Sequence, residues 1–172
     1  MGRLADELAQ EAARFLRDTY LPRLERALET LPPADLWWQP HDGSLAVGTI
    51  LRHLEGNLRQ WIVSGLGGGP DTRDRAGEFA SGERPDAARL MGALDGTLRE
   101  ACALIERLGE EGLARSYPIQ GAQVTGLYAV LHVVEHFSWH TGQVVWIAKA
   151  RAGVAHGLAF HDDQQVNAAR NG

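Results

Sequence analysis

Residues 128–143 read Tyr-Ala-Val-Leu-His-Val-Val-Glu-His-Phe-Ser-Trp-His-Thr-Gly-Gln. Apolar residues continue through and beyond this stretch, and several of them are three or four positions apart, which is the period of one face of an α-helix. The series comprises Leu127, Leu131, Val134, Trp139, Val144 and Ile147. Thr125 is placed to cap the start of such a helix, and Gly153 to end it after about Ala152. The sequence therefore predicts a long final helix that carries histidines.

The N-terminal part of the chain predicts a second long helix. Apolar residues at the same spacing extend from Leu4 to Leu31. Pro22 lies inside this helix and is expected to bend it, because proline lacks the backbone N–H and its ring clashes with the preceding turn. Leu31-Pro32-Pro33 ends the helix, and residues 34–38 are predicted to form a short helical turn.

A third helix is predicted between these two. Ser44 is its expected N-cap, and its apolar positions extend from Val47 to Ile62. The glycine-rich residues 65–70 end it. The following residues, Asp71 to Arg84, are charged and contain glycine, so we expect an exposed connection there.

A fourth helix and a small hairpin fill the remaining gap. Pro85 is expected to open the helix, which carries apolar residues from Leu90 to Leu108 and ends at Gly109 and Gly112. Residues 116–124 contain a Gln-Gly turn and predict a small hairpin or ordered loop before the last helix.

These elements together predict an all-α protein with one domain over residues 1–172. Four long amphipathic helices without a pattern of parallel strands favour a four-helix bundle. A chain of 172 residues buries roughly 70% of its unfolded surface, which is enough for one stable core. Residues 154–172 have no strong hydrophobic period, so we expect a weakly structured tail.

Composition and charge exclude several classes of protein. The net charge is −5 and the pI is about 5.8, which argues against nucleic acid as a partner, because phosphate binding needs clustered basic residues. The single cysteine, Cys102, rules out an internal disulfide and suits a reducing compartment. The sequence contains neither a signal peptide nor an apolar run of the roughly 18–20 residues that a membrane span needs. We therefore expect a soluble, cytoplasmic protein without a membrane partner.

The histidines offer a metal site. Three of them, His132, His136 and His140, lie at intervals of four, so neighbouring members share a helix face. Two imidazoles at this spacing can bind one divalent ion at ~2.0–2.1 Å. His53 lies among apolar residues of another helix and is placed to supply a third ligand, since metal sites in bundles use inward side chains of facing helices. Hydrogen-bonded packing of these histidines in the core is the alternative.

Three motifs in this order resemble those of one family. They are His-Leu-x-Gly-Asn at His53–Asn57, Arg-x-Arg-x-x-Glu-Phe at Arg73–Phe79 and Glu-His-x-x-x-His-x-Gly-Gln at Glu135–Gln143. The chain resembles the DinB-like (YfiT-like) superfamily, and within it a bacterial branch to which we assign no substrate. The resemblance covers residues 35–149 clearly and the first helix more loosely.

The resemblance implies a bundle of up-down-down-up topology that binds a divalent metal, commonly zinc or nickel. The ligands that it implies are His53, His136 and His140. It also implies metal-assisted chemistry with a low-molecular-weight thiol such as bacillithiol, mycothiol or glutathione, a small-molecule substrate and a homodimer. No cysteine lies near the motifs, so a thiol in the reaction would come from a cofactor.

Other polar residues near the motifs are weaker candidates. For His132 we leave open a role in catalysis, in binding a ligand, or in packing, and Glu135 is either a general base or the partner of an arginine. Asn57 and Gln143 are candidates for substrate binding near the histidines. Gly142 is attributed to close approach of a neighbouring helix. The segment Arg73–Phe79 is interpreted as a solvated, salt-bridged connection rather than a lid.

Three hypotheses for the function follow. The first is a metal-dependent, thiol-using transferase with the three-histidine site. The second is a small metallohydrolase or peptidase, because His132-Val-Val-Glu135-His136 matches the inverted zinc-peptidase motif with Glu135 as the base. The third is a noncatalytic bundle that binds a metal or a small ligand. The five tryptophans are assigned mainly to the core, with some left available to line a pocket or a dimer face.

Overall fold

The computed structural model describes residues 2–80, 82–153 and 157–159. Its α-helices are α1 (Arg3–Arg14), α2 (Leu21–Thr30), α3 (Val47–Leu58), α4 (Arg75–Phe79), α5 (Ala87–Ile105), α6 (Gly109–Ala114) and α7 (Gly126–Ala152). A π-helical segment, Arg59–Leu66, continues α3. The two strands, β1 (Ser116–Ile119) and β2 (Ala122–Thr125), pair antiparallel. The predicted all-α bundle with a hairpin before its last helix is confirmed.

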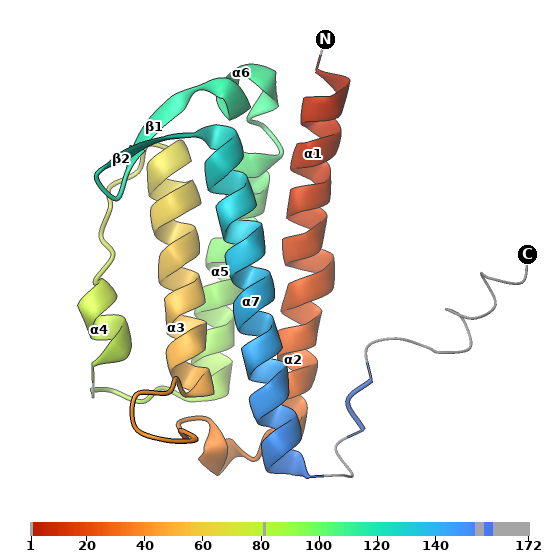
Figure 1. Cartoon of the computed structure of the whole chain (residues 1–172), viewed down its shortest axis with the longest axis vertical. Helices are drawn as coiled ribbons and strands as arrows, with labels where there is room; N and C mark the ends of the chain where they lie inside the picture. The colour runs from red at the N-terminus through yellow and green to blue at the C-terminus, as the bar shows by residue number, and fades with distance from the viewer. Residues whose placement is uncertain (1, 81, 154–156, 160–172) are drawn as a thin grey trace, which may run out of the picture.

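The four long helices lie side by side and have the predicted up-down-down-up topology. In Figure 1, α1 and α2 descend as one column, α3 and α5 both ascend, and α7 descends. Helices α3 and α7 are antiparallel neighbours. Residues on the facing sides of these two helices can therefore meet across the bundle.

The column formed by α1 and α2 is continuous through Pro22. A π-helical segment, Phe15–Tyr20, joins the two helices directly before this proline. The wider π turn accommodates the ring that would otherwise clash with the Asp18 carbonyl four residues earlier. Proline thus changes the winding of the helix in this protein without ending it.

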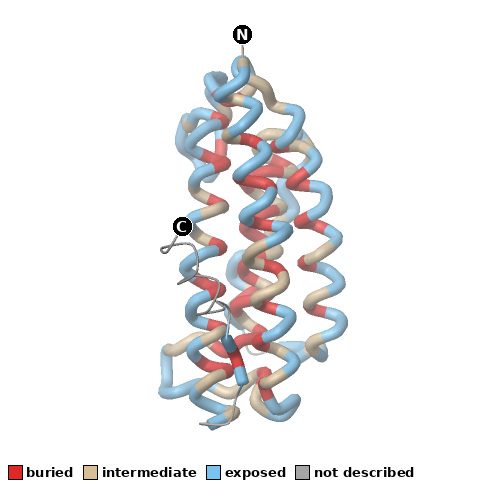
Figure 2. The backbone as a smooth tube through the Cα atoms, turned by 90° about the vertical axis from the view of Figure 1, so that its right-hand side faces the viewer, coloured by how far each residue is buried: buried red, intermediate tan, exposed pale blue. Residues whose placement is uncertain are grey.

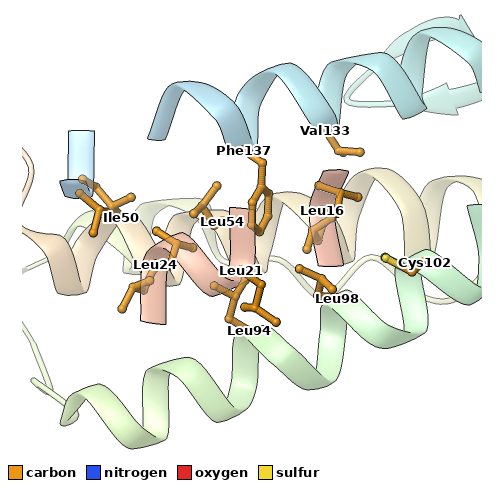
Figure 3. Packing of buried hydrophobic residues seen from close by; sticks show 14 of the residues in the cluster. Leu16, Leu21, Leu24, Ile50, Leu54, Leu94, Leu98, Cys102, Val133 and Phe137 are labelled. Carbon is orange, nitrogen blue, oxygen red and sulfur yellow. The ribbon is translucent and has the colours of Figure 1, made fainter. Parts of the chain in front are cut away.

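The core lies between the four helices, and buried residues follow their inner faces (Figure 2). Figure 3 shows Phe137 of α7 among leucines of the other helices, including Leu16, Leu54 and Leu98. These side chains are fully buried, and each contributes about 1.5–3 kcal/mol through removal of apolar surface from water. Leu4 is an exception to the predicted apolar series, because it is exposed at the open end of the bundle.

Two predicted helix starts are wrong by one or two residues, and one is confirmed. Ser44 does not cap α3, because its hydroxyl donates to the His41 carbonyl at 2.6 Å in the preceding loop. Helix α5 is capped by Asp86, whose carboxylate accepts from the backbone N–H of Arg89, and not opened by Pro85. Thr125 caps α7 as predicted and accepts from the N–H of Tyr128.

The segment between α3 and α5 differs most from its prediction as an exposed connection. Because α3 and α5 run in the same direction, the chain must return along the whole bundle between them (Figure 1). This return path contains α4, which packs beside α3 and buries Glu78. Two charged side chains of the segment, Arg73 and Glu78, are therefore buried against the bundle and pair with each other at 2.6 Å. Its other charged residues are exposed, as the sequence predicts.

The prediction for the fourth helix is also corrected at its end. Helix α5 stops at Ile105, three residues before Leu108, and a separate short helix, α6, follows. The predicted hairpin is present, with Ser116 opposite Thr125. Its turn uses Gln120 and Gly121, both with positive φ, as a two-residue hairpin turn requires.

The tail contributes one described side chain to the core, since Leu158 is buried. Residues 154–156 and 160–172, which include His156 and His161, lie outside the described residues, so the prediction of a weakly structured tail is untested there. Within the described part of the chain, no helix combines the length and hydropathy that a membrane span requires.

Two glycines in long helices differ in what surrounds them, and this predicts opposite effects of alanine. Gly142 faces open space, so the expected close helix approach is wrong, and Gly142→Ala should raise the free energy of unfolding by about 0.5–1 kcal/mol through helix propensity. At Gly56 a Cβ would overlap the Glu78 carboxylate, so Gly56→Ala should lower the free energy of unfolding by about 1–3 kcal/mol. Urea unfolding of both variants tests this, and equal effects of the two would contradict it.

Candidate metal centre

The three predicted ligands come together between α3 and α7. His53 lies in the middle of α3, and His136 and His140 lie one turn apart on the facing side of α7. One ring nitrogen of each lies within 4.8 Å of the other two, and the Nε2 atoms of His53 and His136 are 2.9 Å apart. The rings meet edge to face, with centroids 4.5–5.1 Å apart. These three histidines can hold a metal ion.

The other ring nitrogens of two ligands are engaged by neighbouring side chains. Gln143 Oε1 lies 2.7 Å from Nδ1 of His140, and Glu78 Oε2 lies 2.9 Å from Nδ1 of His53. Because both oxygens accept hydrogen bonds, each Nδ1 carries the proton and each Nε2 keeps its lone pair for a metal. This donor set fits a divalent ion that prefers imidazole ligands.

Glu78 in turn pairs with Arg73, for which the sequence predicts a position in a solvated connection. Arg73 donates from Nε to Glu78 Oε1 at 2.6 Å and from Nη2 to Oε2 at 2.9 Å. Both side chains are buried, at 2% and 8% exposure. Burial raises the pKa of Glu78, but the hydrogen bonds from Arg73 and His53 outweigh it and leave that pKa below its usual value.

Arg73 Nη2 also lies 3.1 Å from His53 Nδ1, so this nitrogen has both a donor and an acceptor within reach. An unprotonated Nδ1 would place its lone pair against the ionised Glu78 carboxylate at 2.9 Å. Arg73 already has Glu78 as its acceptor. The arrangement therefore favours a protonated Nδ1 that donates to Glu78, which leaves Nε2 of His53 facing His136.

Two contacts cover the site on the side of α4. The Glu78 carboxylate packs against the bare backbone of Gly56, one turn beyond His53 on α3. The ring of Phe79, the last residue of α4, lies 5.1 Å from the ring of His53. Arg73 and Glu78 were visible in the sequence as the Arg-x-Arg-x-x-Glu-Phe motif. Their role could not be recognised there, because their contact with His53 depends on the return path of the chain.

The three histidines of α7 are uncharged at neutral pH, because the pKa of each is lowered. Burial lowers the pKa of His136 to about 3, with further contributions from His140, His53 and His132. Burial is also the main reason why the pKa values of His140 and His132 are lowered. Neutral imidazoles can bind a metal without first losing a proton.

These shifts predict how the metal-free protein responds to acid. The unfolded chain binds a proton at His136 below about 6.5, whereas the folded chain does so only near 3, so stability falls as pH decreases through this window. Each proton of this kind contributes a slope of about 1.4 kcal/mol per pH unit. Urea unfolding of chelator-treated protein from pH 7 to pH 4 measures the slope, and His136→Gln should reduce it. A stability that does not change over this range would refute the prediction.

His132 and Asn57 form the next layer along the two helices. The ring of His132 lies 3.9 Å from that of Trp61 and 5.4 Å from that of His136. The Asn57 amide lies 3.3 Å from Nε2 of His132. Asn57 is buried, yet its Oδ1 has no hydrogen-bond partner among the described residues. The Asn57 amide oxygen can therefore accept a hydrogen bond from a molecule bound next to the histidine cluster.

Glu135 is placed differently from the other candidates. Its side chain is exposed and lies on a shallow surface together with Tyr20, Leu131 and Ser138. This surface is on another side of α7 from His136 and His140. The inverted peptidase motif needs this carboxylate next to the metal. The geometry therefore favours the set with His140 over the set with His132 and Glu135.

The part of the chain that carries this site matches a known family of proteins. The model of the family described as a protein of unknown function, DUF1572, matches residues 6–156. The chain belongs to this family. The three histidines, Arg73 and Glu78 of this DUF1572 protein all lie within the matched residues. A search of the curated proteins found no match.

The fold of this DUF1572 protein is also that of a solved structure. It is similar to the crystal structure of a DinB-like protein from Bacillus subtilis, with a TM-score of 0.63 and 17% sequence identity. The match covers 87% of this chain and 94% of the other. The similarity supports the DinB-like fold that the sequence motifs implied.

The only cysteine of this DUF1572 protein lies away from the cluster. Cys102 of α5 is buried, with Sγ 3.7 Å from the Ala13 carbonyl, and burial raises the pKa of its thiol to about 11. A thiol of this kind is neither ionised nor accessible at neutral pH. The chain itself therefore offers no reactive thiol to the metal centre.

Proposed function

We propose that the protein is a metal-dependent enzyme that holds one divalent ion, zinc or nickel, on His53, His136 and His140. The observation that carries this proposal is the convergence of three imidazoles from two helices, two of them oriented through Nδ1. Three protein ligands leave a coordination position for a small molecule, which is the arrangement of catalytic sites.

The reaction that we propose is transfer of a low-molecular-weight thiol, of the bacillithiol, mycothiol or glutathione type, to a small electrophile. A divalent ion bound at the histidines would lower the pKa of a thiol bound to it, so that the thiol could ionise at neutral pH. The burial of Cys102 supports an external thiol, because the chain has no other cysteine to provide one.

The side chains around the cluster have distinct parts in this proposal. Glu78 and Gln143 keep the rings of His53 and His140 in position. His132 is neutral at pH 7 and its ring lies next to that of His136, so its imidazole is our candidate to take the proton that the thiol releases. Asn57 supports His132, and its free Oδ1 can accept a hydrogen bond from substrate.

Metal analysis of purified wild-type protein and of single alanine variants at His53, His132, His136 and His140 tests the site. We expect stoichiometric metal in the wild type and in His132→Ala, and loss of metal in the other three. Loss in His132→Ala with retention in His140→Ala would instead support the peptidase-type site. Absence of metal, together with no stabilisation by added zinc or nickel, would support a noncatalytic bundle.

A thermal-shift screen of the metal-loaded protein with glutathione, bacillithiol and mycothiol tests the reaction class. At least one thiol should raise the melting temperature, and its S-methylated form should not. If metal is bound and no thiol stabilises the protein, the thiol part of the proposal fails while the metal site stands.

A further inference from the structure

A groove opens directly beside the metal centre. It lies between the N-terminal end of α3 with its preceding loop and the second half of α7, and its volume is about 490 Å³. This size is typical of pockets for small molecules. Its walls include Leu45, Ile50, Trp139, Gln143, Trp146 and Ile147.

The groove continues the line of the three histidines. Ile50 precedes His53 on α3 by three residues, and Gln143 follows His140 on α7 by three residues. Because α3 and α7 are antiparallel, both steps lead toward the same end of the bundle (Figure 1). Gln143 connects the groove with the histidine cluster, since it lines the groove and accepts the hydrogen bond from His140 at 2.7 Å. The end of a bound molecule that is nearest the cluster therefore lies about one helical turn from the metal ligands.

The lining of the groove is mainly apolar, and the described residues that form it include no lysine, arginine, aspartate or glutamate. Its histidine, His41, is exposed, and Nδ1 of that ring lies 2.9 Å from the backbone carbonyl of Asp42. An ionised group would lose hydration in the groove, and the lining offers it no permanently charged partner. Trp139 and Trp146 are 64% and 60% exposed, which is unusual for residues of this size, and both line the groove, so they are among the tryptophans that the sequence left available for a pocket. Two accessible indoles offer flat surfaces on which an aromatic ring can stack.

We infer that this groove binds the uncharged, apolar and preferably aromatic body of the substrate, with the reacting end of that molecule directed past Gln143 to the metal centre. This inference rests on the proposed function and specifies its second substrate. The thiol cofactors named above carry charged groups, so the groove takes the electrophile and not the thiol.

The experiment uses a matched pair of naphthalene probes, 2-naphthalenemethanol and the 2-naphthoate anion, titrated calorimetrically into the metal-loaded wild type. We expect the alcohol to bind at one site and about tenfold or more tightly than the anion. Equal binding of the two probes, or tighter binding of the anion, would overturn the inference.

A space-filling variant locates the binding. Gly142 lines the groove and faces open space in a helix, so Gly142→Leu narrows the groove without disturbing packing. Gly96→Leu is the matched control, because Gly96 of α5 is also a helical glycine in open space and does not line the groove. We expect about a tenfold or larger loss of probe affinity for Gly142→Leu and less than about a twofold change for Gly96→Leu. Unchanged affinity in Gly142→Leu would overturn the inference.

Two further measurements distinguish a failure of the groove from a failure of the metal site and from dimer formation. Metal content of both variants should equal that of the wild type, and probe binding to chelator-treated protein should persist, because the groove does not depend on the metal. Size-exclusion chromatography should give the same oligomeric state for all three proteins. A dimer that becomes a monomer only in Gly142→Leu would show that a second copy covers the groove, and would overturn the inference.

Discussion

Replacing His136 with alanine is expected to reduce bound divalent metal from stoichiometric amounts to background. The ring of His136 contacts both other rings of the cluster, at centroid distances of 4.9 Å from His53 and 4.5 Å from His140. Its removal leaves two ligands on different helices without the ring that connects them. Residues that only orient a ligand typically contribute 10–100-fold to metal affinity, so loss of this ligand should exceed about 100-fold.

Chelator competition after equilibrium dialysis measures this effect. His41→Ala is the matched control, because His41 is exposed in the loop before α3 and lies outside the histidine cluster. The control should bind metal like the wild type. If His136→Ala retained metal with wild-type affinity, the cluster would be a packing arrangement of histidines and the proposed function would be lost with it.

Replacing Arg73 with alanine is expected to destabilise the protein by about 3–5 kcal/mol, because it leaves the Glu78 carboxylate buried without its main partner. The double variant Arg73→Met/Glu78→Leu removes both charges and should recover most of this loss. Urea unfolding of the metal-free proteins measures both effects. A single variant as stable as the wild type would mean that the pair is not buried as described.

The same variants separate stability from positioning of the metal ligand. Although the double variant should fold stably, it cannot hold Nδ1 of His53, so its metal affinity should stay about 10–100-fold below that of the wild type. Glu78→Gln keeps the shape of the side chain but provides a weaker acceptor and should also lower metal affinity. Wild-type metal affinity in the double variant would show that Glu78 serves stability alone.

These predictions concern residues that the sequence revealed to different degrees. His136 and His140 could be paired from their spacing alone, because four residues make about one helical turn and the geometry of a turn is local. His53 needed either the assumption of a facing helix or the resemblance of the motifs. Gln143 could be placed near the histidines for the same local reason, since it is three residues from His140.

Arg73 and Glu78 show what local reasoning cannot reach. Charged residues in a glycine-containing segment are usually solvated, and nothing in their spacing predicts burial. They are buried because α3 and α5 are parallel, so the segment between them returns along the flank of α3 and meets His53. The open surroundings of Gly142 and the exposure of Trp139 and Trp146 likewise depend on which helix lies opposite, and this is a property of the assembled bundle.

Local sequence patterns were sufficient to predict the four long helices, the hairpin, the cap at Thr125 and the face of α7 that carries the histidines. Each of these depends on interactions within about a turn of helix or a tight turn of the chain. The tertiary structure alone decided which nitrogens converge, which side chains hold them, and where an apolar groove reaches the metal centre. Those features join residues far apart in the sequence, such as His53 with His136 and Glu78, and they exist only once the helices have packed.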